Sequence, residues 1–564
     1  MNGQRSEATR LLCAGTYLNV GFRHRVIDEL LGHEERPVPP SHGVDVLVVL
    51  AHALRARRLD VVTALTLLSV WVAFFAVGWS RSGGGSGGSG GSGSGPAAAD
   101  VLAPLVFAAV CFVLWGARFV SGRGTAVYAV DRSARVALRV ARARMGAARR
   151  GAAMVVTFWA RLFAIGYWVW AVYVFTEAPG AVIFPLALMA AVWVHRTHMA
   201  RLMRNELGKD AFPLQPPPRL PVTARVGRVA RAIAREQYAP GALYDPQRPF
   251  VGAGVPFQPW SFALELRRKE FAAPVPDPDP AAATGPGPGP GPGPGPDGLT
   301  SRRVIDLIRP RLEALRRSAA RDSRDRLREL AFDEFVYLPS GVGRDEGVYE
   351  PAELQRHLAE SVDEGGEARR HFLRVRVGAW GEQLVVTVLV RVHTQGGMLV
   401  LEVVPHVLGP VLEEFRDVDV IAARRPDDVL RDGVSALLTS PTATFAAALS
   451  MVGTVAQVLR TWLANPARAL PDGPLNSVRE MGSTDEVSLF QQMDVSRYVK
   501  TVQDRIENGV RDALEAQGYE TDRFEQQVVQ VREGGVFIGQ MAGGAVATGP
   551  GAQATHKEER SAAR

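Results

Sequence analysis

Cysteine is almost absent from this sequence of 564 residues, and its two cysteines, Cys13 and Cys111, lie far apart. Two cysteines placed in this way form neither a disulfide framework nor a Cys-x-x-Cys redox or zinc motif. The chain also lacks the Gly-x-x-x-x-Gly-Lys-Ser/Thr phosphate loop, the His-Glu-x-x-His zinc motif and the calcium-binding loop. The sequence therefore contains no recognised cofactor or metal motif, and we expect no cofactor.

Acidic residues are missing from four apolar runs in the first two-fifths of the chain, at residues 61–78, 101–116, 158–175 and 181–194. A helix needs about 20 mostly apolar residues to cross a bilayer. The sequence therefore predicts an α-helical membrane domain of four spans in two helical hairpins. Only residues 177–180 separate the last two runs, and Pro and Gly there suit a tight turn. Without an acid in any span, a proton or ion relay has no paired charges, which disfavours transport.

Basic residues are concentrated on one side of these runs. Residues 122–151 hold eight arginines and one acid, Asp131, whereas residues 80–100 hold only Arg81 and residues 177–180 hold no basic residue. Positive loops stay in the cytoplasm. This pattern predicts a multi-pass protein of the plasma (inner) membrane with both termini cytoplasmic. Residues 1–60 are too polar and too long for a secretory signal, so no cleavage is expected.

Arg161 is the one charge inside the third run. An arginine within a membrane marks an ion or substrate path in some proteins. Alternatively, its long side chain reaches the cytoplasmic surface, which places only the stem in lipid. A central arginine costs about 2.5–3.5 kcal/mol on insertion scales, and the second arrangement largely avoids this cost. We therefore favour an anchor over a relay, with Arg161 kept as the candidate functional residue of the membrane domain.

The net charge of +7 comes from the loops and flanks of the apolar runs. Such a placement suits the anionic lipids of the inner leaflet, and no nucleic acid is expected as a partner. Residues 222–237 have the pattern of a basic amphipathic helix, with Val222, Val226, Val229 and Ile233 at helical spacing. This helix either lies on the inner leaflet or packs on the cytoplasmic domain, and the pattern suits both.

Two low-complexity stretches divide the chain. Residues 82–95 are entirely Gly and Ser, which form a flexible coil, and residues 285–296 are a strict Gly-Pro repeat, which forms an exposed tether. The predicted parts are a helical amino-terminal segment (1–60), the first transmembrane hairpin (61–120), a basic cytoplasmic loop (121–157), the second hairpin (158–203), a basic and Pro-rich juxtamembrane region (204–280), the Gly-Pro linker (281–298), a cytoplasmic α+β domain (299–530) and a Gly-rich tail (531–564).

The α+β domain is predicted because the spacing of its apolar residues changes from a helical period to the alternation of strands. Residues 301–330 and 351–362 have the apolar spacing of helices, and Pro310 should kink or split the first of them. Three strand-like runs follow at 372–377, 384–393 and 398–404, with tight Gly-containing connections. They predict a three-stranded antiparallel meander.

One further apolar run, residues 445–463, contains Gln457, Arg460 and other polar residues. It is interpreted as a buried or membrane-surface helix rather than a fifth span.

The tail contains two β-prone pieces joined by Gly at residues 534–549. This run loosely resembles the amyloid-type signalling motifs at the ends of some bacterial defence and signalling proteins. The resemblance implies stacking through Val536, Phe537 and Ile538 and assembly into a homo-oligomer. Because glycine weakens sheets, the favoured interpretation is a hairpin or tail that does not form fibrils.

Residues 248–254, Arg-Pro-Phe-Val-Gly-Ala-Gly, are followed by Trp260. This run resembles one in uncharacterised actinobacterial multi-pass membrane proteins, and the resemblance implies no particular activity. The glycines do not lie between a clear strand and helix, so no nucleotide loop is inferred.

No catalytic set stands out either. His195 and His198 share a helix face but are better explained as interfacial polar residues than as metal ligands. His393 and His406 have no acidic residue at a spacing that indicates a catalytic pair. The leading hypothesis is a plasma-membrane protein that anchors a cytoplasmic α+β domain for binding unknown protein partners. The alternatives are a self-assembling signalling protein that uses its tail, and a disfavoured transporter or membrane enzyme.

Overall fold

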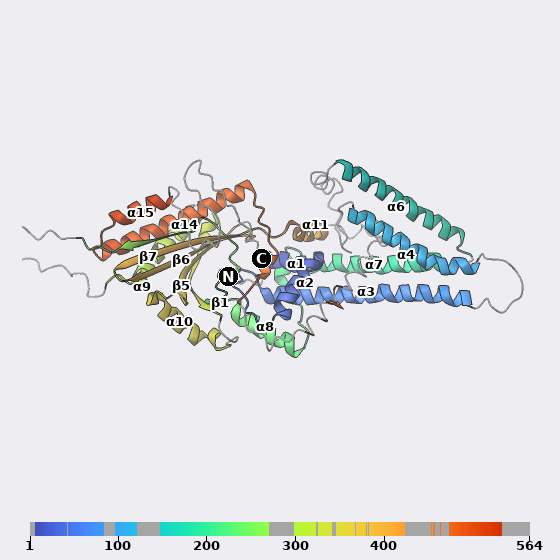
Figure 1. Cartoon of the computed structure of the whole chain (residues 1–564), viewed down its shortest axis with the longest axis horizontal. Helices are drawn as coiled ribbons and strands as arrows, with labels where there is room; N and C mark the ends of the chain where they lie inside the picture. The colour runs from blue at the N-terminus through green and yellow to red at the C-terminus, as the bar shows by residue number, and fades with distance from the viewer. Residues whose placement is uncertain are drawn as a thin grey trace, which may run out of the picture. The chain divides into compact units, whose positions relative to one another are not determined.

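The computed structural model describes residues 6–41, 43–83, 96–120, 147–176, 178–269, 298–322, 325–340, 346–366, 368–379, 381, 383–423 and 473–532, together with residues 453, 455, 456, 459 and 463. The chain divides into two units, each assembled from separate stretches (Figure 1). The helical unit contains residues 1–34, 43–233 and 411–469, and the α+β unit contains residues 35–42, 234–410 and 470–564.

The helical unit begins with two short helices, each with a polar cap. Ser6 accepts a 3.1 Å hydrogen bond from the backbone N–H of Thr9, and Asn19 accepts one of 2.7 Å from that of Phe22. The described elements are α1 (Glu7–Leu18), α2 (Val20–Ile27), the π-helix η2 (Asp28–Gly32), α3 (Val46–Gly83), α4 (Pro96–Val120), α6 (Ala147–Tyr173), α7 (Gly180–Asn205), η3 (Phe212–Leu214), α8 (Ala224–Glu236), η6 (Glu413–Arg416) and α11 (Asp417–Ala422).

Among the described residues, three helices are long and apolar enough to cross a membrane, at Val46–Ser80, Met154–Tyr173 and Gly180–Asn205. They indicate membrane association. The fourth expected span falls in α4, where the apolar part, Leu102–Ala117, is shorter than the others. The structure thus supports three of the four predicted spans by length and composition.

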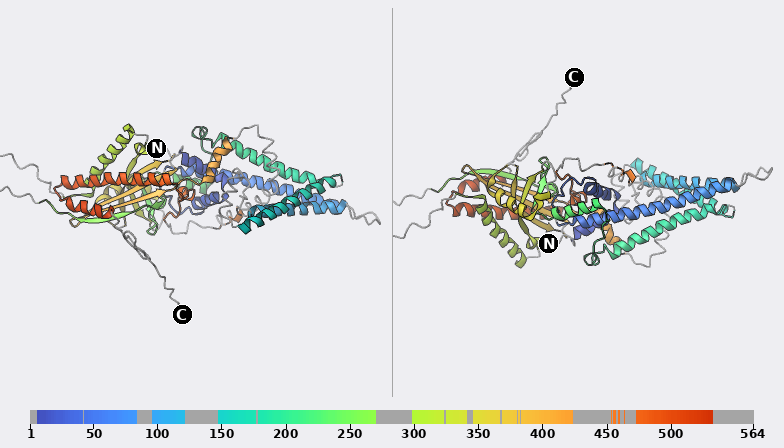
Figure 2. Two further views of the ribbon diagram at one scale, coloured as in Figure 1. Left: turned by 90° about the horizontal axis from the view of Figure 1, so that it is seen from above. Right: turned by 90° about the horizontal axis from the view of Figure 1, so that it is seen from below.

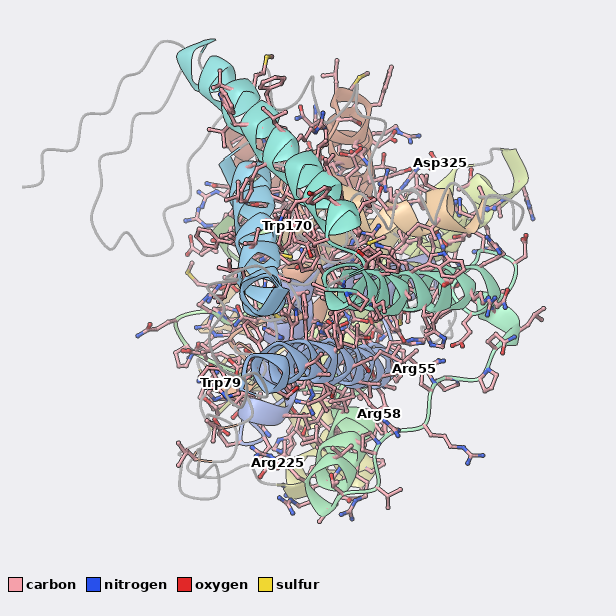
Figure 3. The ribbon with its side chains drawn as sticks, turned by 90° about the vertical axis from the view of Figure 1, so that its right-hand side faces the viewer. Arg55, Arg58, Trp79, Trp170, Arg225 and Asp325 are labelled. Carbon is pink, nitrogen blue, oxygen red and sulfur yellow. The ribbon has the colours of Figure 1, made fainter. Side chains whose placement is uncertain are left out.

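The long helices pack through aromatic and small side chains. Phe74 of α3 stacks on Phe184 of α7 at 4.9 Å between ring centroids, and Phe107 of α4 lies 5.2 Å from Tyr167 of α6. The hydroxyl of Tyr167 donates a 2.7 Å hydrogen bond to the carbonyl of Ala181, which joins α6 to α7. Figure 3 views these helices from the end that carries Trp79 and Trp170.

Helix α8 begins after Val222, which is fully exposed, and buries the rest of the predicted apolar stripe. Val226, Val229 and Ile233 are 8%, 4% and 1% exposed, while Arg228 on another face is exposed and pairs with Glu34 at 3.2 Å. The apolar stripe is therefore already covered by protein. The buried stripe therefore favours the interpretation in which residues 222–237 pack on protein over the one in which they lie on the inner leaflet.

The described residues of the α+β unit contain one mixed sheet of seven strands. Its elements are β1 (Gly241–Tyr244), β2 (Val255–Pro256), β3 (Trp260–Glu265), α9 (Ser301–Asp322), η4 (Arg326–Glu329), β4 (Ala331–Pro339), η5 (Glu346–Tyr349), α10 (Pro351–Glu364), β5 (Arg370–Ala379), β6 (Leu384–Gln395), β7 (Met398–Leu408), α13 (Val478–Met481), α14 (Leu489–Ala516) and α15 (Asp522–Arg532). The strand order is β1-β4-β5-β6-β7-β2, and β3 also pairs with β7. The β1–β4 pair is parallel and the other pairs are antiparallel.

This sheet is larger than the predicted three-stranded meander. β5, β6 and β7 occupy the predicted strand runs, but β1, β2 and β3 precede the Gly-Pro repeat and still join the same sheet. β1 is only four residues long and all four of its side chains are buried. Its sequence therefore lacks the alternation of apolar and polar residues by which a half-buried strand is recognised. The expected helix 301–330 ends at Asp322, continues through Pro310 without being split, and is followed by η4 and β4.

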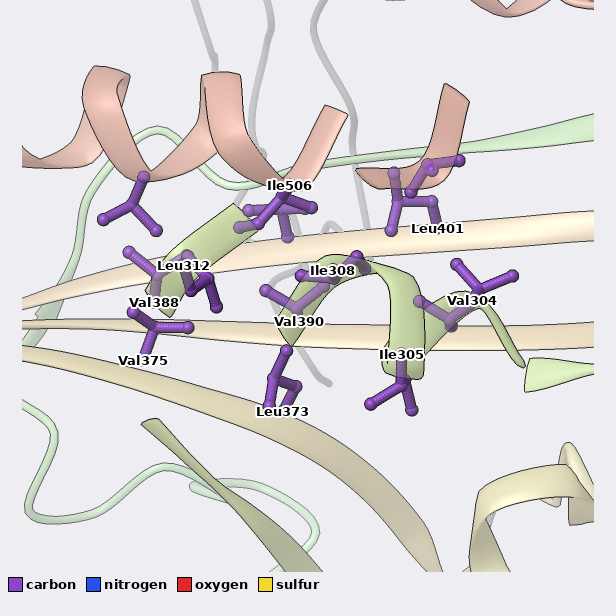
Figure 4. Close-up of a cluster of buried hydrophobic side chains, with 14 of the residues drawn as sticks. Val304, Ile305, Ile308, Leu312, Leu373, Val375, Val388, Val390, Leu401 and Ile506 are labelled. Atoms are coloured by element: carbon purple, nitrogen blue, oxygen red, sulfur yellow. The ribbon is translucent and has the colours of Figure 1, made fainter. Parts of the chain in front are cut away.

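The main core of this unit lies between the sheet and helices α9 and α14 (Figures 2 and 4). Ile308 and Leu312 of α9 and Ile506 of α14 are fully buried against Val388 and Val390 of β6. Gly509 permits the close approach of α14 to α9, since a Cβ there would lie 2.7 Å from the Cα of Ile308. Each such buried side chain contributes about 1.5–3 kcal/mol.

Candidate functional site

A polar cluster lies where α3 changes from polar to apolar. We call Arg23, Asp60, Thr63 and His195 the junction cluster. Asp60 is the last charged residue before the apolar run 61–78, and the cluster draws on α2, α3 and α7. It therefore marks the point at which the apolar run of α3, part of a candidate membrane span, begins.

Arg23 is the centre of this cluster. Its side chain is 1% exposed, its Nη2 pairs with Asp60 Oδ2, and its Nη1 donates a 3.2 Å hydrogen bond to the carbonyl of Thr16 in α1. A buried guanidinium that loses its partner is strongly destabilising because its charge stays out of water. Arg23 thus holds α1 and α2 against the first part of α3.

The hydroxyl of Thr63 joins His195 to this cluster. Thr63 Oγ1 lies 2.9 Å from the carbonyl oxygen of Leu59 and 2.8 Å from His195 Nδ1. The other ring nitrogen, His195 Nε2, faces Asp60 Oδ1 at 4.0 Å. His195 therefore connects α7 to Thr63 and Asp60 of α3.

Two more arginines join the same helices. Arg10 of α1 is 1% exposed; its Nη1 donates to the carbonyl of Leu207 at 2.9 Å and lies 2.9 Å from Asp419 of α11. Burial opposes the charge of Arg10, but its hydrogen bonds to Glu7 and Asp419 raise the pKa of the guanidinium above its ordinary value. These contacts fasten α1 and α11 to the end of α7.

Arg55 makes the second of these ties. It forms a bidentate pair with Glu206, with Nη2 2.9 Å from Oε1, and so joins α3 to the end of α7. Arg55 and Arg58 are labelled in Figure 3.

The other polar residues singled out in the sequence lie elsewhere. Arg161 is exposed on α6 and is not among the buried residues between the long helices. The anchor interpretation of Arg161 remains a prediction. His198 is exposed while His195 is buried, and the described residues hold no group of three or more His, Cys, Asp or Glu that could bind a metal. Val536, Phe537 and Ile538 lie outside the described residues.

Sequence reasoning missed Arg23 and Asp60. The available signal was the position of Asp60, one residue before an apolar run. Nothing local indicated Arg23, because it pairs with a residue 37 positions away.

In the α+β unit, residues 248–254 form a loop that covers one face of the sheet. The ring of Phe250 packs edge-on against Tyr337 at 5.4 Å, Phe372 at 5.7 Å and His406 at 5.0 Å. Gly254 has φ +93°, and a Cβ on it would lie 2.3 Å from the carbonyl oxygen of Val407. Glycine is therefore required where the loop meets β7.

Two amides of this loop bind a carboxylate of the chain itself. The N–H groups of Gly252 and Gly254 donate to Glu480 Oε1 at 2.7 and 3.0 Å. Successive amides directed at one point form an anion-binding nest, and here Glu480 occupies it. The loop thus serves as an internal clamp in this structure.

Arg479 completes this clamp. It is 1% exposed, and its Nη2 donates to the carbonyls of Gln383 and Gly409 at 2.5 and 2.8 Å. Burial lowers the pKa of Arg479 to about 10, so the side chain stays charged at neutral pH. Arg479 and Glu480 together hold α13 to the sheet.

A third polar cluster joins α9 to the sheet. Glu334 of β4 lies 3.0 Å from His371 Nε2, accepts a 2.7 Å hydrogen bond from Arg302, and also pairs with Arg309. The hydrogen bond from His371, followed by that from Arg302, lowers the pKa of Glu334 to about 2. A carboxylate with three donors is a poor general base, so this cluster is suited to holding α9 in place.

A cavity of about 480 Å³ lies between α14 and α15. Its walls carry charges of both signs, and Arg511 pairs with Glu525 across it at 3.2 Å. The lining residues are Thr501, Asp504, Arg505, Glu507, Asn508, Arg511, Phe524, Glu525 and Val528. The mixture of opposite charges gives this cavity no preference for an anion or a cation.

A family model described as AbeC-like domain matches residues 259–545, just over half of the chain. The match begins immediately before β3 and extends past α15. Neither the curated proteins nor the solved structures contain a match to this chain.

Proposed function

The chain belongs to the AbeC-like domain family, and we propose that it is an integral membrane protein that anchors an α+β domain for binding protein partners. The observation that carries the proposal is the outer surface of the long helices. Val62 of α3 is 55% exposed, Ile165 of α6 is 59% and Ile183 of α7 is 54%. Exposed apolar surface of this extent is unfavourable in water and suits the acyl chains of a bilayer.

The topology proposed is four spans with both termini in the cytoplasm. α4 supports the fourth span because the whole helix has 25 residues, and about 20 are needed to cross the bilayer. The eight arginines between residues 122 and 151 support the orientation. The exposed Arg228 on α8 suits the headgroups of anionic lipids, which we propose as partners of this unit.

A binding role is supported by how the α+β unit uses its polar groups. Glu334, Arg479 and Glu480 are all engaged in contacts that hold the unit together. In contrast, Leu489, Phe490 and Met493 at the start of α14 are 69%, 70% and 60% exposed. Large apolar side chains grouped in this way are typical of a surface that contacts another protein.

Two experiments test the proposal. Alkaline extraction of membranes should leave the full chain in the membrane pellet. Ile165→Asp should reduce membrane insertion, since a central acid costs about 2.5–3.5 kcal/mol, whereas Arg161→Lys on the same helix should not. Release of the unaltered chain into the supernatant would contradict the anchor.

The second experiment tests partner binding. A photo-crosslinking residue at Phe490, in the full chain in native membranes, should form protein adducts. The matched position is Ile165, which should form mainly lipid adducts. Failure to detect any protein adduct at Phe490, with lipid adducts present at Ile165, would contradict the binding role while leaving the anchor intact.

A further inference from the structure

Two exposed arginines lie at the polar ends of the apolar faces of α3 and α7. Arg58 of α3 and Arg201 of α7 both have exposed side chains. In the part of the chain that the structure describes, no acidic side chain pairs with either of them. We call these two residues the outward arginines, in contrast to Arg23 and Arg55, whose charges are compensated within the protein.

The outward arginines lie at the same level along the two helices. α3 and α7 run antiparallel there, because Arg55 pairs with Glu206 while Thr63 lies 2.8 Å from His195. Each outward arginine falls between the two bridging residues of its own helix. At a rise of 1.5 Å per residue, the two bridges on α3 enclose a band about 12 Å tall.

The acidic residues of this band are already engaged. Asp60 is the acid of α3 in the band and pairs with Arg23, and Glu206 is the acid of α7 and pairs with Arg55. These stretches of α3 and α7 therefore supply no further negative charge for the outward arginines.

Each outward arginine is followed by an exposed apolar face. Val62 and Leu65 come four and seven residues after Arg58 and are 55% and 51% exposed. Val194 comes seven residues before Arg201 and is 62% exposed. Intervals of four and seven residues place side chains on one side of a helix. Both helices thus present a positive charge at the end of an apolar face, which complements the phosphate and acyl chains of a phospholipid.

From these observations we propose that the outward arginines bind the phosphates of anionic phospholipids in the leaflet at the Arg58 end of α3. The headgroup supplies the negative charge, and its acyl chains cover the apolar face beside the arginine. The inference rests on the proposed membrane anchor and deepens it, because two such contacts at one level fix the depth of the helical unit in the bilayer. Each arginine should favour an anionic over a zwitterionic lipid about fivefold.

The experiment measures lipid preference separately beside each arginine, in the full chain reconstituted in mixed bilayers of phosphatidylcholine and phosphatidylglycerol. A fluorophore on Val62→Cys reports the surroundings of the outward arginine of α3, and one on Val194→Cys reports those of the outward arginine of α7. Either the anionic or the zwitterionic lipid is brominated, so that quenching measures which lipid lies beside the label. The native Cys13 and Cys111 are 0% and 2% exposed, and the unaltered chain controls for labelling at these two positions.

We expect the anionic lipid to be preferred about fivefold at both labels. Arg58→Gln should remove this preference at the Val62 label and retain it at the Val194 label. Arg201→Gln should do the reverse. Arg58→Lys should retain the preference at both labels, since an ammonium group also binds phosphate as a point charge. Arg317→Gln, which removes an exposed charge from α9 of the α+β unit, should change neither.

Quenching with no anionic preference, or a preference that survives both arginine substitutions, would overturn the inference while leaving the anchor in place. An equal loss at both labels in every variant, Arg317→Gln included, would also overturn it, since it would indicate net charge and not local binding. Loss of the preference on adding inorganic phosphate at constant ionic strength would show an anion site open to water instead of a lipid contact. If neither label were quenched by either lipid, the anchor itself would fail, and the inference with it.

Discussion

Replacing Asp60 by Asn should loosen the amino-terminal helices from α3. The substitution keeps the size of the side chain but removes the charge that compensates Arg23, whose side chain is 1% exposed. Breaking a buried ion pair costs about 3–5 kcal/mol. We expect the lower end, about 3 kcal/mol, because Asn still accepts a hydrogen bond and Asp60 is 23% exposed.

The thiol of Cys13 reports this loosening. Cys13 is 0% exposed in α1, and Arg23 holds α1 through the carbonyl of Thr16. Burial, and secondarily Asp45, raise the pKa of the Cys13 thiol well above its ordinary value, so it should react only when the helices open. In a Cys111→Ala background, 3 kcal/mol corresponds to labelling of Cys13 that is about 100-fold faster, since each 1.4 kcal/mol is tenfold.

The matched control is Glu34→Gln. It breaks the pairs of Glu34 with Arg228 and Arg225, whose side chains are 57% and 27% exposed, and pairs open to solvent contribute about 0–1 kcal/mol. Labelling of Cys13 should then change by less than about fivefold. If Asp60→Asn accelerates labelling no more than Glu34→Gln does, Arg23 is not a buried charge that depends on Asp60, and the reasoning fails.

Three further predictions concern other parts of the chain. Gly254→Ala should destabilise the α+β unit by about 1–3 kcal/mol, because Gly254 has a positive φ and lies against the carbonyl of Val407. Chemical denaturation monitored by proteolysis measures this loss of stability. Gly396 has φ +59° and open space around it, so Gly396→Ala should destabilise the unit less. Glu334 has a pKa of about 2 against an ordinary 4.5, so its contribution to stability is complete above about pH 4.5 and is lost as the pH falls toward 2. Glu334→Gln should flatten the dependence of the denaturation midpoint on pH in that window, and an unchanged profile would contradict this. Reporter fusions at Gly90 and Gly289 should report the outside of the cell and the cytoplasm respectively, and finding both in one compartment would disprove the topology.

Several features followed from the sequence because they depend on local pattern. The three candidate spans are recognisable from length and polarity, since a bilayer has a fixed thickness. The alternation of Leu373, Val375 and Val377 with Arg374 and Arg376 placed β5, because a strand repeats every two residues. These signals need no knowledge of what the element packs against.

Other features were decided only by the tertiary structure. β1 pairs with β4 and β3 pairs with β7 across the Gly-Pro repeat, and a low-complexity stretch does not reveal which strands on its two sides will pair. A fragment that begins at Leu299, as the sequence suggested, would therefore lack three strands of the sheet.

The same limit applies to the candidate site and to the Gly-containing run at residues 248–254. His195 is 132 residues from its partner Thr63, and Glu480 is 228 residues from Gly252. Length, polarity and period are properties of neighbours in sequence, whereas a buried charge finds its partner only when distant helices and loops have come together. The sequence by itself therefore determined the apolar spans and the central strands, and the tertiary structure decided the partners of Arg23, His195 and Glu480.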